Sequence, residues 1–266
     1  MIGVIAIFAA FTLLGSDAQA DQSSLSAKDV MENLVNRNSG EQVSRNLRFE
    51  LTSSSGKQRV ESAESYRIQS DNANKIVLFY TNPSRIRGIG FLTFDYSDPE
   101  ANDDQWLYLP AFRKIRRISA SNRGDYFLGT DFTFEQIKKE QKIQITDYEF
   151  NLVAVPESEE APTYIVEALP RTDAIRDAIG HSKAIFHVSA TTWLPIYTEY
   201  YNANGNLHKT IELETTEEIE GILTPTEILA EDKITGHQTR LTISEIDYSA
   251  DVDERLFTQA RLRRGL

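Results

Sequence analysis

The spacing of apolar residues is the feature that most constrains what this chain can fold into. From Leu47 onward, short runs of β-branched and aromatic residues alternate with polar residues, and turn-forming residues separate the runs. Leu47, Phe49 and Leu51 occupy alternate positions, and the Ser-Ser-Ser-Gly sequence of residues 53–56 leads into a partner run over residues 57–69. This pattern predicts a β-hairpin. Because the pattern recurs along the chain, we expect a predominantly antiparallel β fold.

The same pattern predicts further strands at residues 75–80, 88–96, 105–118, 143–155, 163–169, 182–190, 195–201, 207–214, 224–231 and 238–248. A helical period appears only at residues 27–36 and 131–141, where Asp131 or Thr133 could cap the second helix. A sheet this long must curl, close or split to hide its apolar face. A sheet that curls around a helix without closing leaves a cavity, whereas the same pattern in many barrels is packed core.

The amino terminus predicts export. Residues 1–15 are apolar except for Thr12 and lead into Ala18-Gln19-Ala20, a small-x-small cleavage pattern. We therefore expect residues 1–20 to be a cleaved signal peptide and the protein to be a soluble, periplasmic monomer. The alternative is an uncleaved anchor, but the apolar run is shorter than the roughly 20 residues that a spanning helix needs. No linker divides residues 21–266, so we expect one domain there.

Composition and motifs exclude several classes of protein. The chain has no cysteine, which excludes disulfides and a lipid-modified amino-terminal cysteine. Its net charge of −12 argues against nucleic-acid binding. No nucleophile elbow, phosphate loop or zinc motif occurs, and the four histidines, at positions 181, 187, 208 and 237, match no metal-binding spacing. We therefore expect no catalysis, no metal and no cofactor.

One segment is similar to a known family. Residues 103–140 carry a Trp-x-Tyr-Leu-Pro strand, then Arg-Lys-Ile-Arg-Arg, then Phe-Leu-Gly-Thr-Asp-Phe. This order resembles the LolA-like outer-membrane lipoprotein-sorting proteins. Residues 194–209 and 236–262 resemble the hairpin and the carboxy-terminal strand of that family. The resemblance implies an incomplete antiparallel half-barrel whose open side is plugged by α-helices, related to LolA, LolB and RseB.

The resemblance also implies a function. We expect a periplasmic carrier that holds a lipid or lipoprotein in an apolar cavity and passes it toward an outer-membrane acceptor. Members of this subgroup are often encoded beside exporters of the resistance-nodulation-division type, so an inner-membrane exporter is an expected partner. Two alternatives stay open at this stage. One is an envelope-stress sensor resembling RseB, which usually has a second carboxy-terminal domain, and the other is a non-catalytic adaptor of the exporter.

Aromatic residues near the family motif are the candidate cavity lining. Trp106 and Tyr108 lie on one face of their strand and Leu107 and Leu109 on the other, so both faces are apolar. We expect Trp106, Tyr108 and Phe112 to form an aromatic wall against acyl chains. The full candidate set for the cavity is Trp106, Tyr108, Phe112, Phe127 and Phe132. The alternative is ordinary core packing.

Two further features adjoin that wall. The basic residues Arg113, Lys114, Arg116 and Arg117 could ring the mouth of the cavity and meet a head group or a partner. They could equally protect an exposed edge strand by their charge. Gly129 and Asp131 mark a break before the second helix, which could be a movable lid or a fixed plug.

Overall fold

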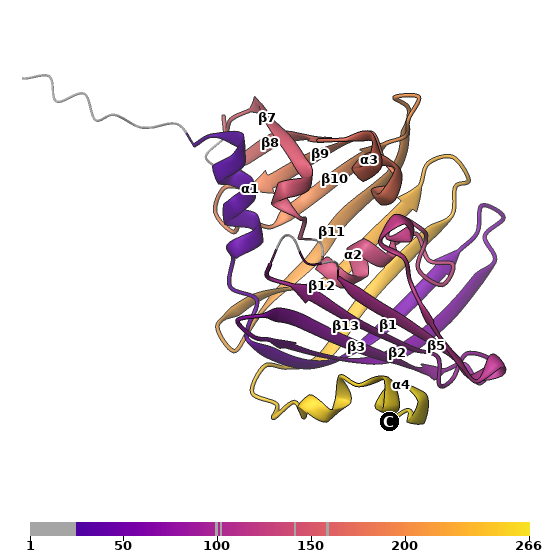
Figure 1. The fold of residues 1–266 in the computed structure, drawn as a ribbon. Helices are drawn as coiled ribbons and strands as arrows, with labels where there is room; N and C mark the ends of the chain where they lie inside the picture. Colours follow the sequence, from indigo (N-terminus) through magenta and orange to yellow (C-terminus); the bar gives the residue numbers. More distant parts are fainter. Residues whose placement is uncertain (1–24, 99–100, 102, 141, 158–159) are drawn as a thin grey trace, which may run out of the picture.

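The computed structural model describes residues 25–98, 101, 103–140, 142–157 and 160–266 (Figure 1). The predicted signal peptide of residues 1–20 lies outside these residues, so the predicted boundary between this leader and the domain that follows it stays a prediction. Among the described helices, none has the length and apolar character to cross a membrane.

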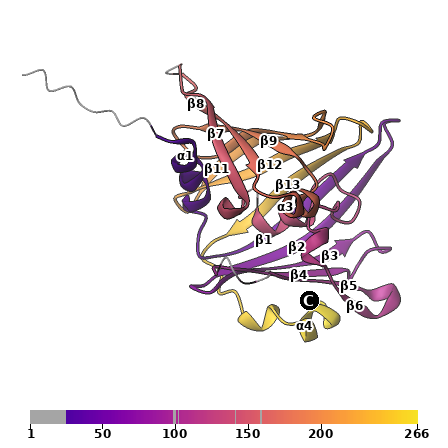
Figure 2. The ribbon, with the colours of Figure 1, turned by 45° about the horizontal axis from the view of Figure 1, so that its top comes forward.

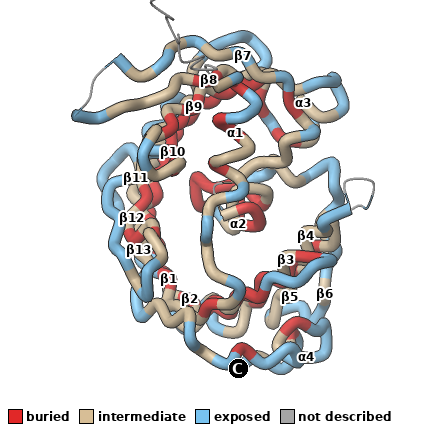
Figure 3. Tube along the Cα trace, turned by 90° about the vertical axis from the view of Figure 1, so that its left-hand side faces the viewer, coloured by how far each residue is buried: buried red, intermediate tan, exposed pale blue. Residues whose placement is uncertain are grey.

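All the described strands belong to one antiparallel sheet of 13 strands, which curls into an open barrel (Figures 1 and 3). Their bounds are β1 (Gln42–Thr52), β2 (Gln58–Gln69), β3 (Ala73–Asn82), β4 (Gly90–Tyr96), β5 (Asp104–Leu109), β6 (Lys114–Arg117), β7 (Tyr148–Ala154), β8 (Thr163–Pro170), β9 (Lys183–Ser189), β10 (Pro195–Tyr201), β11 (Leu207–Ile219), β12 (Ile222–Asp232) and β13 (Gln238–Asp247).

The described helices are α1 (Ala27–Asn36), α2 (Phe134–Lys139), α3 (Asp173–Ile179) and α4 (Gln259–Arg264), with short 3-10 turns η1 (Pro110–Phe112), η2 (Ala120–Asn122), η3 (Ile145–Asp147) and η4 (Glu254–Leu256).

The strand order is nearly the order of the sequence. Consecutive strands pair from β1 to β6 and from β7 to β13, and β1 also pairs with β13, which joins these two halves of the sheet. Strands β6 and β7 are the two edges and do not pair with each other. Helix α1 contacts β7 and β8. Residues 118–140 and 142–147, here called the crossing segment, lead from β6 at one edge to β7 at the other. The predicted half-barrel plugged by helices is confirmed.

The alternating pattern decides which side chains enter the barrel. Leu47, Phe49 and Leu51 of β1 point inward, and all three are buried. Helix α1 begins with a capping box between Ser26 and Asp29, and its apolar side chains join the same interior core. Figure 3 shows α2 inside the ring of strands. Tertiary packing therefore concentrates the main core between the sheet, α1 and α2.

A second, smaller core lies on the outer face of β3, β4 and β5. Figures 1 and 2 show α4 on this outer side. Phe257 and Leu262 at the carboxy terminus pack there with Val77, Phe79 and Leu92. Both faces of β3 are therefore covered, which explains why residues 76–80 form an unbroken run of buried apolar side chains.

Three sequence predictions about elements are wrong. The strand predicted at residues 143–155 contains the η3 turn and becomes a strand only at Tyr148. Residues 105–118 form a hairpin rather than one strand, because Pro110 starts the η1 turn and Arg113 takes a left-handed backbone with φ of 51°. The second helix spans Phe134–Lys139 rather than residues 131–141, and its cap is Thr133, whose hydroxyl accepts from the Gln136 N–H. The sequence reasoning also missed α3 and α4, each of seven residues or fewer.

Candidate functional site

Helix α2 divides the barrel interior into two pockets. Gln136 lines both of them, whereas Thr133 and Glu135 face one pocket and Ile137 and Glu140 face the other. Each pocket is therefore bounded by the sheet on one side and by α2 on the other.

The first pocket, here called the arginine pocket, lies between α2 and the strands at the β1–β13 junction. Its cavity volume is about 80 Å³, below the range of about 300–1,000 Å³ that is typical of ligand pockets, so an acyl chain fits only if the pocket widens. Most of its wall is apolar. The apolar lining residues are Leu47, Ile76, Leu78, Phe132, Ile137, Pro225, Ile228, Leu241 and Ile243.

Charged side chains are confined to one part of the arginine pocket. Arg37, Arg45 and Arg67 are the cations of its lining, and Glu140 is the carboxylate. Arg45 pairs with Glu140, and the Arg67 Nε atom lies 3.6 Å from the second Glu140 oxygen. The side chains of Arg45 and Arg67 are 13% and 3% exposed, so both charges are held largely out of water.

Burial disfavours the charged form of these arginines. It lowers the pKa of Arg45 to about 9, with the charge of Arg67 adding to the effect. Burial likewise lowers the pKa of Arg67 to about 10. Both groups are still cations at neutral pH, as guanidinium groups in proteins are. The pocket therefore holds its positive charge at an energetic cost.

A lysine extends this positive region outward. The Lys142 ammonium donates to the Ser39 hydroxyl at 3.1 Å, and Arg67 also donates to that hydroxyl at 3.3 Å. Burial, followed by the charges of Arg37 and Arg67, lowers the pKa of Lys142 to about 8. Lys142 lines a neighbouring surface depression that shares Arg67 and Glu140 with the arginine pocket. The cations thus stand where the interior meets the surface.

The second pocket, here called the tyrosine pocket, lies between α2 and strands β7 to β11. Its cavity volume is about 40 Å³, and Tyr148, His181 and Tyr200 are part of its wall. The Tyr148 hydroxyl and the His181 Nε2 atom are 3.1 Å apart. Burial, reinforced by the charge of Lys209, lowers the pKa of His181 to about 3, so this imidazole is neutral.

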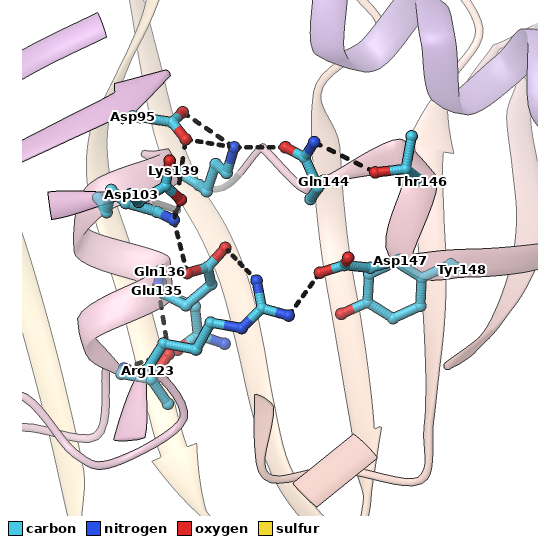
Figure 4. Close-up of polar contacts among 12 residues, drawn as sticks. Asp95, Asp103, Arg123, Glu135, Gln136, Lys139, Gln144, Thr146, Asp147 and Tyr148 are labelled. Atoms are coloured by element: carbon cyan, nitrogen blue, oxygen red, sulfur yellow. Dashed lines mark hydrogen bonds and ion pairs between the residues drawn. The ribbon is translucent and has the colours of Figure 1, made fainter. Parts of the chain in front are cut away.

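Ion pairs fix α2 between the two pockets (Figure 4). Lys139 donates to Asp95 and to Gln144, each at 2.7 Å, and Arg123 contacts Asp147 at 2.6 Å. Buried Lys138 contacts Asp103 and lies 2.9 Å from Glu135. Burial alone would lower the pKa of Lys138, but these carboxylates outweigh it and raise the pKa. We call this set of contacts the α2 latch.

Comparisons with known proteins agree on the fold. A sequence-family model described as an "uncharacterized protein" family matches residues 72–264. The chain belongs to this family. Its fold is LolA-like. The search of curated proteins found no matching sequence.

Three solved structures support the LolA-like fold. A DUF1329 family protein from Desulfovibrio piger has a TM-score of 0.80 at 22% identity, over 89% of this chain and 97% of that one. A domain named for outer-membrane lipoprotein sorting, from Vibrio parahaemolyticus, has a TM-score of 0.79 at 20% identity, over 90% and 98%. A LolA superfamily protein from Nitrosomonas europaea has a TM-score of 0.65 at 18% identity, over 90% and 100%.

The LolA-like barrel separates the candidate aromatic residues. Trp106 and Tyr108 point to the outer face and pack in the core beneath α4, whereas Leu107 points inward. Phe112 lies in the η1 turn and is 70% exposed. The structure therefore does not assemble these three aromatic side chains into a wall of either interior pocket.

Phe127 and Phe132 do lie inside the barrel. Phe132 lines the arginine pocket. Phe127 is fully buried among aromatic rings, with the Phe91 and Phe134 centroids at 5.1 and 5.3 Å, so it belongs to the packed core.

The predicted basic rim and lid residues lie outside the arginine pocket. Arg113, Lys114, Arg116 and Arg117 are exposed on the β5–β6 hairpin, at one edge of the sheet. Gly129 has a left-handed backbone, with φ of 83°. Asp131 is buried and does not cap α2. Its carboxylate accepts from the Thr239 hydroxyl and lies 2.6 Å from the His237 Nδ1 atom.

Sequence reasoning missed Arg37, Arg45, Arg67 and Lys142. The sequence does contain a signal for two of these residues, Arg45 and Arg67. Arg45 has the same strand parity as Leu47, Phe49 and Leu51, which places a guanidinium on the inward face. Arg67 shares its parity with buried Ala63 and Ser65. Among the described residues, no group of three or more His, Asp or Glu side chains could hold a metal ion.

Proposed function

We propose that this protein is a periplasmic carrier that binds a lipid, or the lipid part of a lipoprotein, in the arginine pocket. The observation that carries the proposal is a pocket with an apolar interior and a polar opening, inside a barrel that is open on one side. Burying each methylene of an acyl chain contributes about 0.8 kcal/mol. An apolar wall of this kind can therefore bind a chain without any catalytic step.

The crossing segment is the element that would admit the cargo. Phe132, Ile137 and Glu140 line the arginine pocket from this segment, and the α2 latch holds it in place. Gly129 and Asp131 form the fixed end of this lid, because the Gly129 carbonyl accepts from Arg59 and the Asp131 N–H donates to the Thr239 hydroxyl.

Contact with partners is proposed for the basic β5–β6 hairpin. An edge strand has unpaired backbone groups, and exposed cations next to them suit the acidic surface of a partner. The proposed partners are an inner-membrane exporter of the resistance-nodulation-division type and an outer-membrane acceptor. Reversing charge with Lys114→Glu and Arg116→Glu should weaken cross-linking to such partners in cells while leaving lipid binding by the purified protein unchanged.

The decisive experiment on the carrier role is native mass spectrometry of the protein purified from a Gram-negative periplasm. A carrier should retain a lipid or an acylated peptide whose mass identifies it. Ile228→Glu, which puts a carboxylate into the apolar wall of the arginine pocket, should abolish retention, whereas Val153→Glu on the exposed side of β7 should not. A wild-type protein that carries no lipid and binds none when offered would contradict the proposal.

A further inference from the structure

The arginine pocket contains more positive charge than its own carboxylate neutralises. Three guanidinium groups, those of Arg37, Arg45 and Arg67, face the single carboxylate of Glu140 in the pocket lining, and Lys142 stands just outside. The chain as a whole has a net charge of −12. A local excess of buried cations in an acidic protein is costly unless an anion offsets it.

The protein's own atoms satisfy these cations only in part. Arg67 donates to the backbone carbonyls of Ser39 and Gly40, and Arg37 makes one long bond of 3.5 Å to the Leu223 carbonyl. The buried Nε atom of Arg45 donates no hydrogen bond within the described structure, and that of Arg67 faces only the Glu140 oxygen, 3.6 Å away. Unused donors on buried guanidinium groups are suited to a carboxylate or phosphate ligand.

The position of Glu140 suggests how such a ligand would be accommodated. Its two oxygens each face a different arginine, Arg45 on one side and Arg67 on the other. Glu140 itself has a left-handed backbone, with φ of 50°, at the carboxy-terminal end of α2. It therefore occupies the place that a ligand's anionic group would take, on the segment proposed to move.

We propose that the arginine pocket is selective for single-chain amphiphiles with an anionic head group, a carboxylate or a phosphate, which displaces Glu140 from Arg45 and Arg67. The acyl chain then lies along the apolar wall, past Phe132 toward Leu241. This inference rests on the proposed carrier function and names the chemical class of its cargo.

The test is calorimetric titration of the purified protein with probes that share a chain of twelve carbons. Dodecyl phosphate and dodecanoate should bind at least tenfold more tightly than dodecanol, and the tighter of the two identifies the head group. Inorganic phosphate, which has no chain, should bind at least a hundredfold more weakly than dodecyl phosphate. Equal affinity for inorganic phosphate would overturn the amphiphile assignment.

Variants separate the head-group site from the chain site. Arg67→Gln and Lys142→Gln should each weaken dodecyl phosphate binding, by tenfold or more for Arg67 and about threefold for Lys142, and leave dodecanol within twofold. If the loss of the Arg67 contacts prevents folding, Lys142→Gln alone tests the head-group site. Glu140→Gln should strengthen dodecyl phosphate binding several-fold, because it removes the competing carboxylate. Arg263→Gln, on the outer helix α4, is the charge-matched control and should change nothing.

The outcomes distinguish the two proposals. If all three twelve-carbon probes bind with equal affinity and the variants affect them equally, the head-group inference is overturned while the carrier function stands. If none of these probes binds to the wild-type protein and no lipid co-purifies, both are overturned.

Discussion

At the scale of single residues, the tyrosine pocket depends on a histidine that stays neutral. His181 is buried beside the Tyr148 hydroxyl, and burial lowers its pKa to about 3 from an ordinary value of 6.5. The unfolded chain therefore binds a proton between these two pH values that the folded chain does not bind. Stability must rise with pH across this window, and it is lost as the pH falls from 6.5 toward 3.

We predict that this one residue accounts for a distinct part of the acid sensitivity. A shift of this size corresponds to a loss approaching about 5 kcal/mol near pH 3, at ~1.4 kcal/mol per pKa unit. Urea unfolding between pH 7.5 and pH 4.5 should show a steep decline for wild type and a shallower one for His181→Gln. His187→Gln, which alters a histidine that is not fully buried, should follow the wild-type slope. If the free energy of unfolding fell with pH at the same slope in all three proteins, His181 would not be the source of this acid sensitivity.

At the scale of elements, the outer helix α4 fits against β4 without spare room. A Cβ atom on Gly90 would lie 2.7 Å from the Leu262 Cδ1 atom, and Leu262 is fully buried. The absence of a side chain at Gly90 is therefore what lets α4 approach the sheet.

A double-mutant cycle tests this contact. Leu262→Ala should cost about 2–5 kcal/mol in the free energy of unfolding because it leaves a cavity. Gly90→Ala should cost about 1–3 kcal/mol through overpacking. The double variant should cost less than the sum of the two, since the smaller residue 262 makes room for the new methyl group. Additive costs, measured by urea unfolding, would show that the two residues are not coupled.

The α2 latch is a second element-scale feature with a measurable contribution. Lys138 is 1% exposed and lies between Asp103 and Glu135. Lys138→Met should lower the free energy of unfolding by about 3 kcal/mol or more, because it leaves partly buried carboxylates without their cation. Lys28→Met breaks the exposed pair with Glu32 on α1 and should cost less than about 0.5 kcal/mol. If both variants lowered the free energy of unfolding equally in urea unfolding, the α2 latch would stabilise the fold no more than an exposed ion pair does.

At the scale of the whole molecule, the crossing segment joins the two halves of the open barrel and covers its interior. We predict that dodecyl phosphate slows amide hydrogen exchange in residues 133–140, because the bound chain would pack against Phe132 and Ile137. Exchange in the outer helix α4 should not change. An unchanged profile across residues 133–140 would contradict the participation of this segment in binding.

Much of the architecture followed from local patterns. Alternation at Leu47, Phe49 and Leu51 predicted inward-facing strands, and the period of Val30 and Leu34 predicted α1 with its observed bounds. The segment from Trp106 to Phe132 predicted the LolA-like fold. These features depend on contacts between residues close in sequence, or on motifs that can be read directly, so no knowledge of the curled sheet was needed.

Only the tertiary structure decided the candidate site. Strand β5 is apolar on both faces, and periodicity cannot say which face enters the barrel; the docking of α4 puts Trp106 and Tyr108 outside. The site's cations come from the loop after α1, from β1 and β2, and from residue 142. The pairing of β1 with β13 and the return of the chain through the gap bring these distant segments together. The alternation of apolar and polar residues thus determined which segments form strands. The long-range pairing of β1 with β13 and the path of the chain through the gap determined where the charged side chains meet.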